Sequence, residues 1–99
     1  MTAPQADEVV HQSTRLKIMA ALESEPDRKP LDFARLKGVT EATDGNLGAH
    51  LATLEKAGYV VIEKEPAGKR TRTLVVLTPD GRNAFERHLA FLRSILADS

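Results

Sequence analysis

The sequence predicts a small α+β domain in which three helices are followed by a two-stranded β-hairpin and a final helix. Two observations predict this order. Apolar residues recur at helical spacing before residue 58 and after residue 79, and two runs of β-branched residues between them flank a loop containing Pro66 and Gly68. The 99 residues suffice for one hydrophobic core, so we expect a single domain over 1–99, with residues 1–6 disordered.

The first of the three helices is predicted over 15–22, with Ser13 as its N-cap. A short helical segment through Val10, capped by Asp7, precedes it. The residues that share one apolar side of the longer helix are Ile18, Met19 and Leu22.

The second helix is expected after a polar loop over 25–30. Asp32 is its predicted N-cap, and Leu31 and Leu36 are spaced to pack on each other as a hydrophobic staple. Gly38 is expected to end this helix in a left-handed conformation.

The third helix is predicted to begin after the N-cap Thr43 and to end at Gly58. The link over 39–42 makes the second and third helices a helix-turn-helix. The buried stripe of the third helix, spaced i, i+4, i+7, consists of Leu47, Leu51 and Leu54.

Two strands are predicted next, over 59–64 and 72–77, joined by the loop 65–71 into a hairpin with a basic tip. Thr78 then caps a C-terminal helix over 79–97, which has proline at its first position. Three helices, a hairpin wing and a last helix are the plan of a winged helix-turn-helix.

Three segments carry a resemblance to a known family: 43–51, 54–60 and 77–82. Together they resemble the winged-helix transcriptional regulators, most closely the compact MarR/ArsR-like group, over residues 13 to 96. The resemblance implies that the third helix enters the major groove of DNA and that the hairpin tip reaches the neighbouring minor groove or backbone. It also implies that the terminal helices build a dimer.

The candidate base-reading residues lie on the third helix. At 100° per residue, the positions opposite the leucine stripe hold small or polar side chains that suit contacts with base edges. His50 lies at the edge of the buried stripe, where it serves either as a hydrogen-bonded boundary residue or as a DNA contact. The predicted DNA-binding residues of this helix are Gly45, Asn46, Ala49, His50, Thr53 and Lys56.

Two glycines of the third helix need an explanation, because each costs about 1 kcal/mol relative to alanine inside a helix. Gly45 points outward, so close approach of DNA accounts for it. Gly48 lies on the flank, where we expect tight packing against the second helix.

The wing tip carries the strongest electrostatic signal. The chain as a whole is neutral, with 14 basic and 14 acidic residues, yet Lys69, Arg70 and Arg72 fall within four positions. Such a run is an ordinary solvated loop in many proteins. After a helix-turn-helix it favours phosphate contact or insertion of an arginine into the minor groove.

The C-terminal helix is apolar on two adjacent stripes, one more than a small core needs to cover. We expect the second stripe to form a two-fold interface, although the core could absorb both. The predicted dimer contacts are Val9, Val10, His88, Phe91, Leu92 and Ile95.

Catalytic and metal-binding functions have little support. There is no cysteine and no recognised catalytic motif, so we expect neither an enzyme nor a cofactor. Glu63 and Glu65 share a strand face, but they are placed to neutralise Lys64 or Arg72. The histidines are scattered, so no metal site is expected. The chain has no apolar run long enough for a membrane span, and its start lacks the pattern of a secretory signal, so a cytoplasmic location is expected.

These observations predict a homodimeric regulator that binds double-stranded DNA and acts as a repressor. Two alternatives stay open. A winged helix can instead serve protein–protein contact, which the neutral charge favours. A ligand- or metal-responsive regulator would have an apolar pocket between the terminal helices of two subunits, with His11 or His88 nearby.

Overall fold

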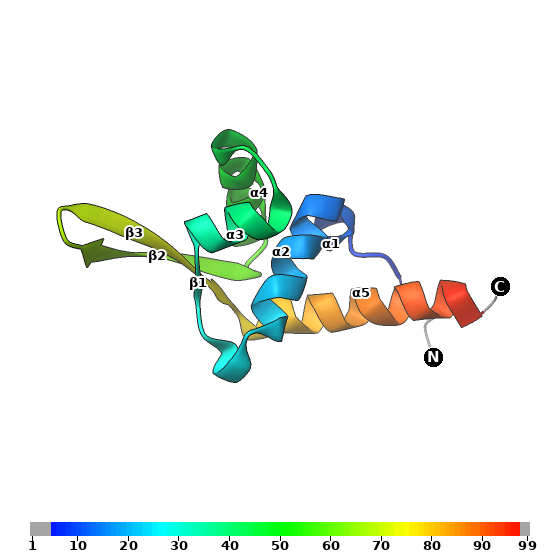
Figure 1. The fold of residues 1–99 in the computed structure, drawn as a ribbon. Helices are drawn as coiled ribbons and strands as arrows, with labels where there is room; N and C mark the ends of the chain where they lie inside the picture. The colour runs from blue at the N-terminus through cyan, green and yellow to red at the C-terminus, as the bar shows by residue number, and fades with distance from the viewer. Residues whose placement is uncertain (1–4, 98–99) are drawn as a thin grey trace.

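The computed structural model describes residues 5–97 and confirms the α+β class (Figure 1). Within the segment expected to be disordered, residues 1–4 lie outside this range, and Gln5 and Ala6 belong to no helix or strand. The elements are α1 (Glu8–His11), α2 (Ser13–Ser24), a 3-10 turn (Pro26–Arg28), β1 (Leu31–Asp32), α3 (Phe33–Thr40), α4 (Asp44–Lys56), β2 (Val60–Ala67), β3 (Arg70–Leu77) and α5 (Pro79–Ala97).

One core joins the helices to the sheet. The predicted apolar stripes of α2 and α4 are buried, and Leu31 and Leu36 are buried with them, as the staple requires. Val75 of β3 and Phe85 of α5 are buried in the same core, so the sheet and α5 pack together with the helix-turn-helix. Because the leucines of α4 face inward at i, i+4 and i+7, the opposite side of that helix faces solvent.

Four predicted N-caps are confirmed, one of them Thr78, whose Oγ1 accepts a hydrogen bond from the backbone N–H of Gly81 in α5. The Asp7 carboxylate accepts hydrogen bonds from two backbone N–H groups of α1, Asp32 accepts from Arg35, and Thr43 accepts from Asn46. These caps satisfy N–H groups that have no partner inside the helix. They therefore fix where α1, α3, α4 and α5 begin.

Two predicted helix boundaries are wrong. The N-cap of α2 is Gln12 rather than Ser13, because the Oε1 of the Gln12 side chain accepts a hydrogen bond from the backbone N–H of Arg15, three residues further on. Helix α3 continues through Gly38 to Thr40, whose buried hydroxyl donates to the carbonyl of Leu36. The left-handed residue is Glu41, with φ 58°, and its N–H closes the helix onto Lys37.

The hairpin is longer than predicted. β2 and β3 pair antiparallel from Val60 opposite Leu77 to Ala67 opposite Arg70, which leaves a two-residue turn. Gly68 opens that turn with φ 66°, a conformation that costs glycine little. Pro66 does not interrupt the pairing, because β2 is an edge strand of the β1-β3-β2 sheet. The short β1 was not predicted.

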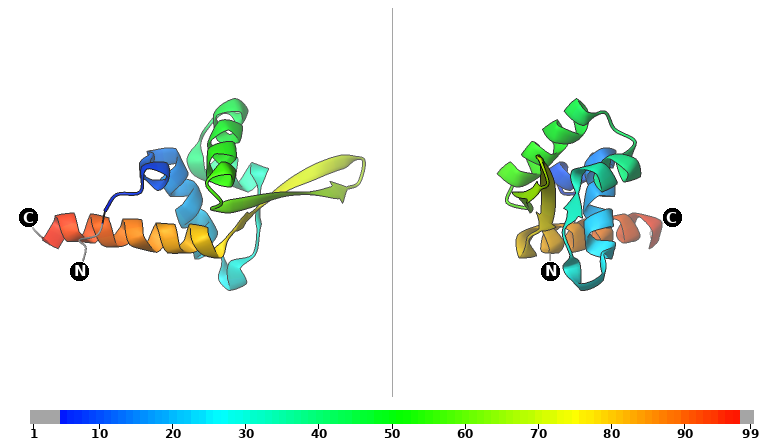
Figure 2. Two further views of the ribbon diagram at one scale, coloured as in Figure 1. Left: turned by 180° about the vertical axis from the view of Figure 1, so that it is seen from behind. Right: turned by 60° about the vertical axis from the view of Figure 1, so that its left-hand side comes forward.

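The molecule is elongated, with extents of 53 × 25 × 24 Å. Figure 2 shows the hairpin projecting at one end and the C-terminal half of α5 at the other, with α4 standing between them. The wing and the C-terminal half of α5 are therefore well separated surfaces.

Candidate nucleic-acid interface

Helix α4 presents a strip of small and polar side chains to solvent. Asn46, Ala49 and Thr53 are all exposed on it, and so are Gly45 at one end and Lys56 at the other. The Thr53 hydroxyl donates to the carbonyl of Ala49 one turn earlier, within the strip itself. The structure thus exposes all five of these predicted residues on the helix that follows the turn.

The two glycines of α4 stand in open space. A Cβ atom added at Gly45 or at Gly48 would meet no heavy atom within 4 Å. The predicted packing of Gly48 against the second helix is therefore wrong. No packing contact within residues 5–97 therefore requires glycine at either position.

The start of α4 carries an acid whose charge is balanced by its neighbour in the helix-turn-helix. The Oδ1 of Asp44 lies 2.6 Å from the Nζ of Lys37 on α3. Both side chains are well exposed, so this pair contributes little to stability. It does remove an isolated negative charge from the end of α4.

His50 contacts an arginine that sequence reasoning did not identify. Its Nδ1 lies 3.1 Å from the Nη1 of Arg15 on α2. Partial burial, and then the Arg15 charge, lower the pKa of His50 below its ordinary value. The two residues lie 35 positions apart in unrelated helices, so no local pattern could have paired them.

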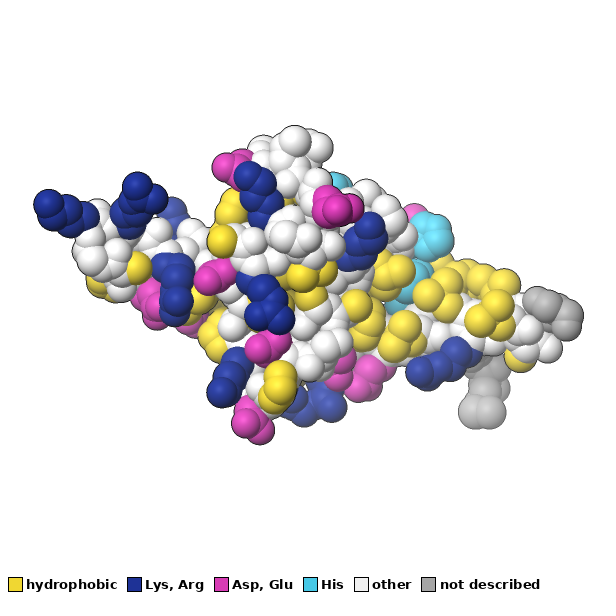
Figure 3. Space-filling model, in the orientation of Figure 1, with side chains coloured by type: hydrophobic (Ala, Val, Ile, Leu, Met, Phe, Trp, Pro, Cys, Tyr) yellow, Lys and Arg dark blue, Asp and Glu magenta, His cyan; other side chains and the backbone are white. Residues whose placement is uncertain are grey.

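The wing presents its cations unequally. Lys69 sits in the turn and Arg70 begins β3, and no ion pair involves either of them within residues 5–97. Arg72 pairs with Glu65, its partner across the hairpin, as expected. Figure 3 shows basic side chains at the wing end of the molecule, with others spread over the helices. Two of the three predicted wing cations therefore keep a full charge for an outside anion.

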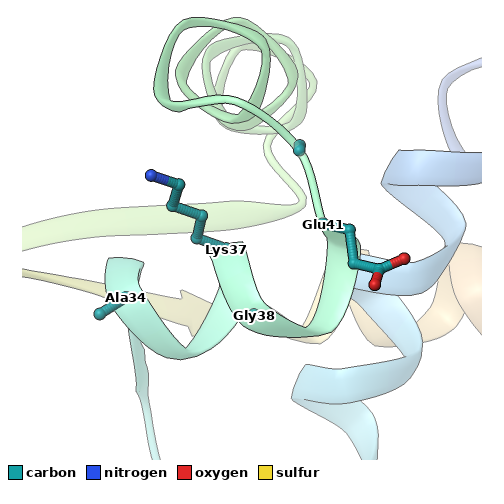
Figure 4. Close-up of a pocket in the computed structure, with 5 residues that line it drawn as sticks. Ala34, Lys37, Gly38 and Glu41 are labelled. Atoms are coloured by element: carbon teal, nitrogen blue, oxygen red, sulfur yellow. The ribbon is translucent and has the colours of Figure 1, made fainter.

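A shallow pocket of about 390 Å³ lies on α3, beside the turn that leads to α4. It is lined by Ala34, Lys37, Gly38, Glu41 and Ala42 (Figure 4). The figure shows the Lys37 and Glu41 side chains pointing apart, so the lining offers no convergent set of polar groups. Such a set is what orients a small ligand in its site.

The predicted dimer residues differ in exposure. Val10 and His88 are completely buried within one subunit, so they offer no surface to a second copy. Val9, Phe91 and Leu92 are half-buried, and Ile95 is 50% exposed. Figure 3 shows apolar side chains gathered over the C-terminal half of α5. Leu96, the neighbour of Ile95 near the end of α5, is 73% exposed.

His88 joins α1 to α5. Its Nδ1 accepts a hydrogen bond from the backbone N–H of Asp7, and its ring packs edge-on against His11 at 5.5 Å between centroids. Residues 5–97 contain no group of three or more potential ligands that could hold a metal ion. No helix in the same range is long and apolar enough to cross a membrane.

Two solved structures share this architecture. A transcriptional regulator homologue from Pyrococcus horikoshii OT3 is 31% identical, with a TM-score of 0.80 over 91% of this chain and 86% of that one. NadR, solved in complex with 4-hydroxyphenylacetate, has a TM-score of 0.66 at 24% identity, over 91% of this chain and 65% of its own. The likeness to NadR shows that the two chains share a fold.

The sequence itself agrees with this likeness. An uncharacterized protein of Methanocaldococcus jannaschii is 36% identical over 75 residues, which cover 76% of this chain and 78% of that protein. Residues 14–96 match the family described as a winged helix DNA-binding domain. The resemblance drawn from the helix-turn-helix and hairpin residues is confirmed, and the chain belongs to the winged helix DNA-binding domain family.

Proposed function

We propose that this protein binds double-stranded DNA sequence-specifically as a homodimer and represses transcription by occluding a promoter. The observation that carries the proposal is the combination of two surfaces. The exposed strip of α4 is polar and open enough to enter a major groove, and the wing ends in two cations without an ion-pair partner in the described chain.

In this proposal the two surfaces have different tasks. Lys69 and Arg70 contact phosphates and set the position of the protein on the duplex. Asn46 suits a bidentate contact with adenine, and Ala49 and Thr53 suit contact with a thymine methyl group. Lys56, at the C-terminal end of the strip, adds a backbone contact. His50 completes the base-reading set.

The exposed apolar surface on α5 supports a dimer. Residues Phe91, Leu92 and Ile95, with Val9 of α1, form the interface in this proposal. A two-fold axis there would place two copies of α4 for two half-sites about one helical turn of DNA apart.

Two alternative functions predict other features. A role in protein–protein contact predicts that acids such as Asp44 and Glu63 interrupt the surface between α4 and the wing. Asp44 pairs with Lys37, whereas Glu63 is exposed on β2 and forms no ion pair within residues 5–97, so this alternative keeps some support from the charges. A ligand-responsive regulator predicts a pocket between the terminal helices of two subunits, with His11 or His88 nearby. His88 is buried against His11 and Asp7, whereas His11 is exposed.

Fluorescence anisotropy tests the proposal. The purified protein is titrated into a labelled duplex taken from the region upstream of its own gene, and into a scrambled duplex, from low to physiological salt. We expect preference for the upstream duplex and a steep loss of affinity as salt rises. Equal binding to both duplexes would contradict sequence-specific reading. Failure to bind either duplex at low salt would contradict the proposal and favour a protein partner.

A further inference from the structure

Arg15 holds two elements together through one guanidinium group. Its Nε–H donates to the carbonyl of Val9 in α1, while its Nη1 lies 3.1 Å from the Nδ1 of His50 in α4. Arg15 is half-buried, and the helix that carries it packs against both α1 and α4. The fork of the guanidinium therefore meets His50 from a position fixed by a second hydrogen bond.

This contact determines which nitrogen of His50 carries the proton. A guanidinium group has only donors, so the Nδ1 of His50 must accept. The neutral ring then carries its hydrogen on Nε2. A protonated ring would turn an N–H group toward the guanidinium, and the lowered pKa of His50 agrees with a neutral ring. At neutral pH, Nε2 is therefore a hydrogen-bond donor.

His50 shares a face of α4 with two residues of the exposed strip. Asn46, His50 and Thr53 follow the spacing i, i+4, i+7, so their side chains lie along one line of the helix. Asn46 and Thr53 are exposed, and His50 is half-buried at the side of α2. A helix docked through this strip would bring the imidazole to the wall of the groove.

We propose that Arg15 is a positioning residue that holds His50 as a single hydrogen-bond donor, with which His50 discriminates against cytosine in the major groove. The inference rests on the proposed function. Guanine presents two acceptors there, N7 and O6, adenine presents N7 and thymine presents O4, whereas cytosine presents only the N4 donor. A lone N–H group matches the guanine edge and leaves the cytosine edge unpaired. We expect guanine to be preferred over cytosine by about fivefold at the contacted position.

Selection from a random duplex pool tests the contact, because the pool contains every candidate binding site. The wild-type protein is compared with His50→Ala, with His50→Gln and, as a matched control, with Asn46→Ala. We expect the wild type to recover a motif from which cytosine is depleted at one position. His50→Ala should make that position indifferent and keep the others, and His50→Gln should shift it toward adenine, since glutamine offers both a donor and an acceptor.

Two results separate this inference from the proposed function. If the wild type recovers no motif, the proposed function itself fails. If His50→Ala recovers the wild-type motif unchanged, or weakens binding equally at all positions, the protein reads DNA but His50 does not discriminate against cytosine. Loss at a single position cannot arise from partial unfolding, which would weaken binding to every sequence alike. Asn46→Ala should alter a different position from His50→Ala.

The role of Arg15 has a direct spectroscopic test. Long-range proton–nitrogen correlation spectra distinguish protonated from unprotonated ring nitrogens, and the His50→Gln spectrum assigns the His50 signals. In the wild type we expect an unprotonated Nδ1 and a protonated Nε2. Arg15→Met should populate both tautomers and weaken the discrimination against cytosine, whereas Arg15→Lys retains a donor and should restore both readouts. A protonated Nδ1 in the wild type would overturn the assignment.

Discussion

The phenol hydroxyl of Tyr59 donates a hydrogen bond to the Oδ2 of Asp7 over 2.7 Å, across 52 positions of the sequence. Tyr59 lies between the end of α4 and the start of β2, and Asp7 caps α1. Partial burial raises the pKa of Asp7, but the bonds from Tyr59 and from the α1 backbone outweigh it, so the pKa lies below its ordinary value. The contact ties the amino end of the domain to the junction of α4 and wing.

Removing this hydroxyl should destabilise the domain. Tyr59→Phe leaves the carboxylate one donor short in a partly buried site, so we expect a loss of about 1–2 kcal/mol in the free energy of unfolding. Urea denaturation at a fixed protein concentration measures it. Ser24→Ala removes an exposed hydroxyl that bonds within α2 and should change stability by less than about 0.5 kcal/mol. Equal effects of the two variants would contradict a structural role for Tyr59.

The wing cations should set the salt dependence of DNA binding. The double variant Lys69→Gln/Arg70→Gln removes two phosphate contacts, so the slope of log affinity against log salt should become shallower by about two. Anisotropy titrations at several salt concentrations measure that slope. Lys29→Gln removes an exposed cation from the loop at the opposite end of Figure 1 from α4, and should leave the slope unchanged. An unaltered slope in the double variant would exclude the wing from the interface.

The apolar end of α5 should control the oligomeric state. Leu92→Glu places a charge within the proposed interface, so we expect the mass measured by light scattering to fall from that of a dimer to that of a monomer. Affinity for DNA should fall with it, because the two half-sites are then bound independently. As a control, Val39→Glu places the same charge on an apolar residue of α3 that is 42% exposed, and this variant should keep the dimer mass. A monomeric wild-type protein would refute the homodimer.

Gly81 and Gly48 should respond to alanine in opposite ways. A Cβ at Gly81 would lie 2.1 Å from the carbonyl oxygen of Tyr59, and backbone cannot move aside as a flexible side chain can. Gly81→Ala should therefore lose about 1–3 kcal/mol in the free energy of unfolding. Gly48→Ala meets open space within α4 and should gain up to about 1 kcal/mol. Thermal or urea unfolding measures both, and a neutral Gly81→Ala would contradict the close approach of α5 to Tyr59.

Acid should weaken the fold through two histidines. Burial lowers the pKa of His50 and of His88 from 6.5, helped by Arg15 at the first and by His11 at the second. Below about pH 6.5 the unfolded chain therefore binds more protons than the folded one, so stability falls as pH drops through the window down to the folded pKa values. Above that window this contribution is constant.

Urea unfolding from about pH 8 to about pH 5 measures this dependence, and His88→Asn should flatten it. The carboxylate of Asp7 acts in a lower window, because its own depressed pKa contributes stability that is lost only as pH falls below 3.8. A stability that rises toward pH 5 would show the opposite sign and contradict the buried, neutral state of these histidines.

Much of the fold follows from local signals. The caps at Asp7, Asp32 and Thr43 and the leucine stripe of α4 involve residues within two helical turns of one another, so their geometry is encoded in the spacing. Boundaries that depend on competition between neighbours were less predictable. Gly38 could have ended α3, but the buried Thr40 extended it by two residues and moved the left-handed position to Glu41.

The sequence by itself therefore determined the class of the fold, the helix-turn-helix, the basic hairpin and the outward strip of α4, because each is a periodic or adjacent pattern. Only the tertiary structure decided the partners of the charged groups and of the histidines. It paired Arg15 with His50, Lys37 with Asp44 and Tyr59 with Asp7. It also buried Val10 and His88, which periodicity alone had placed at a surface. Such contacts depend on how whole helices pack, and that packing is set by the sum of many weak interactions rather than by any local spacing.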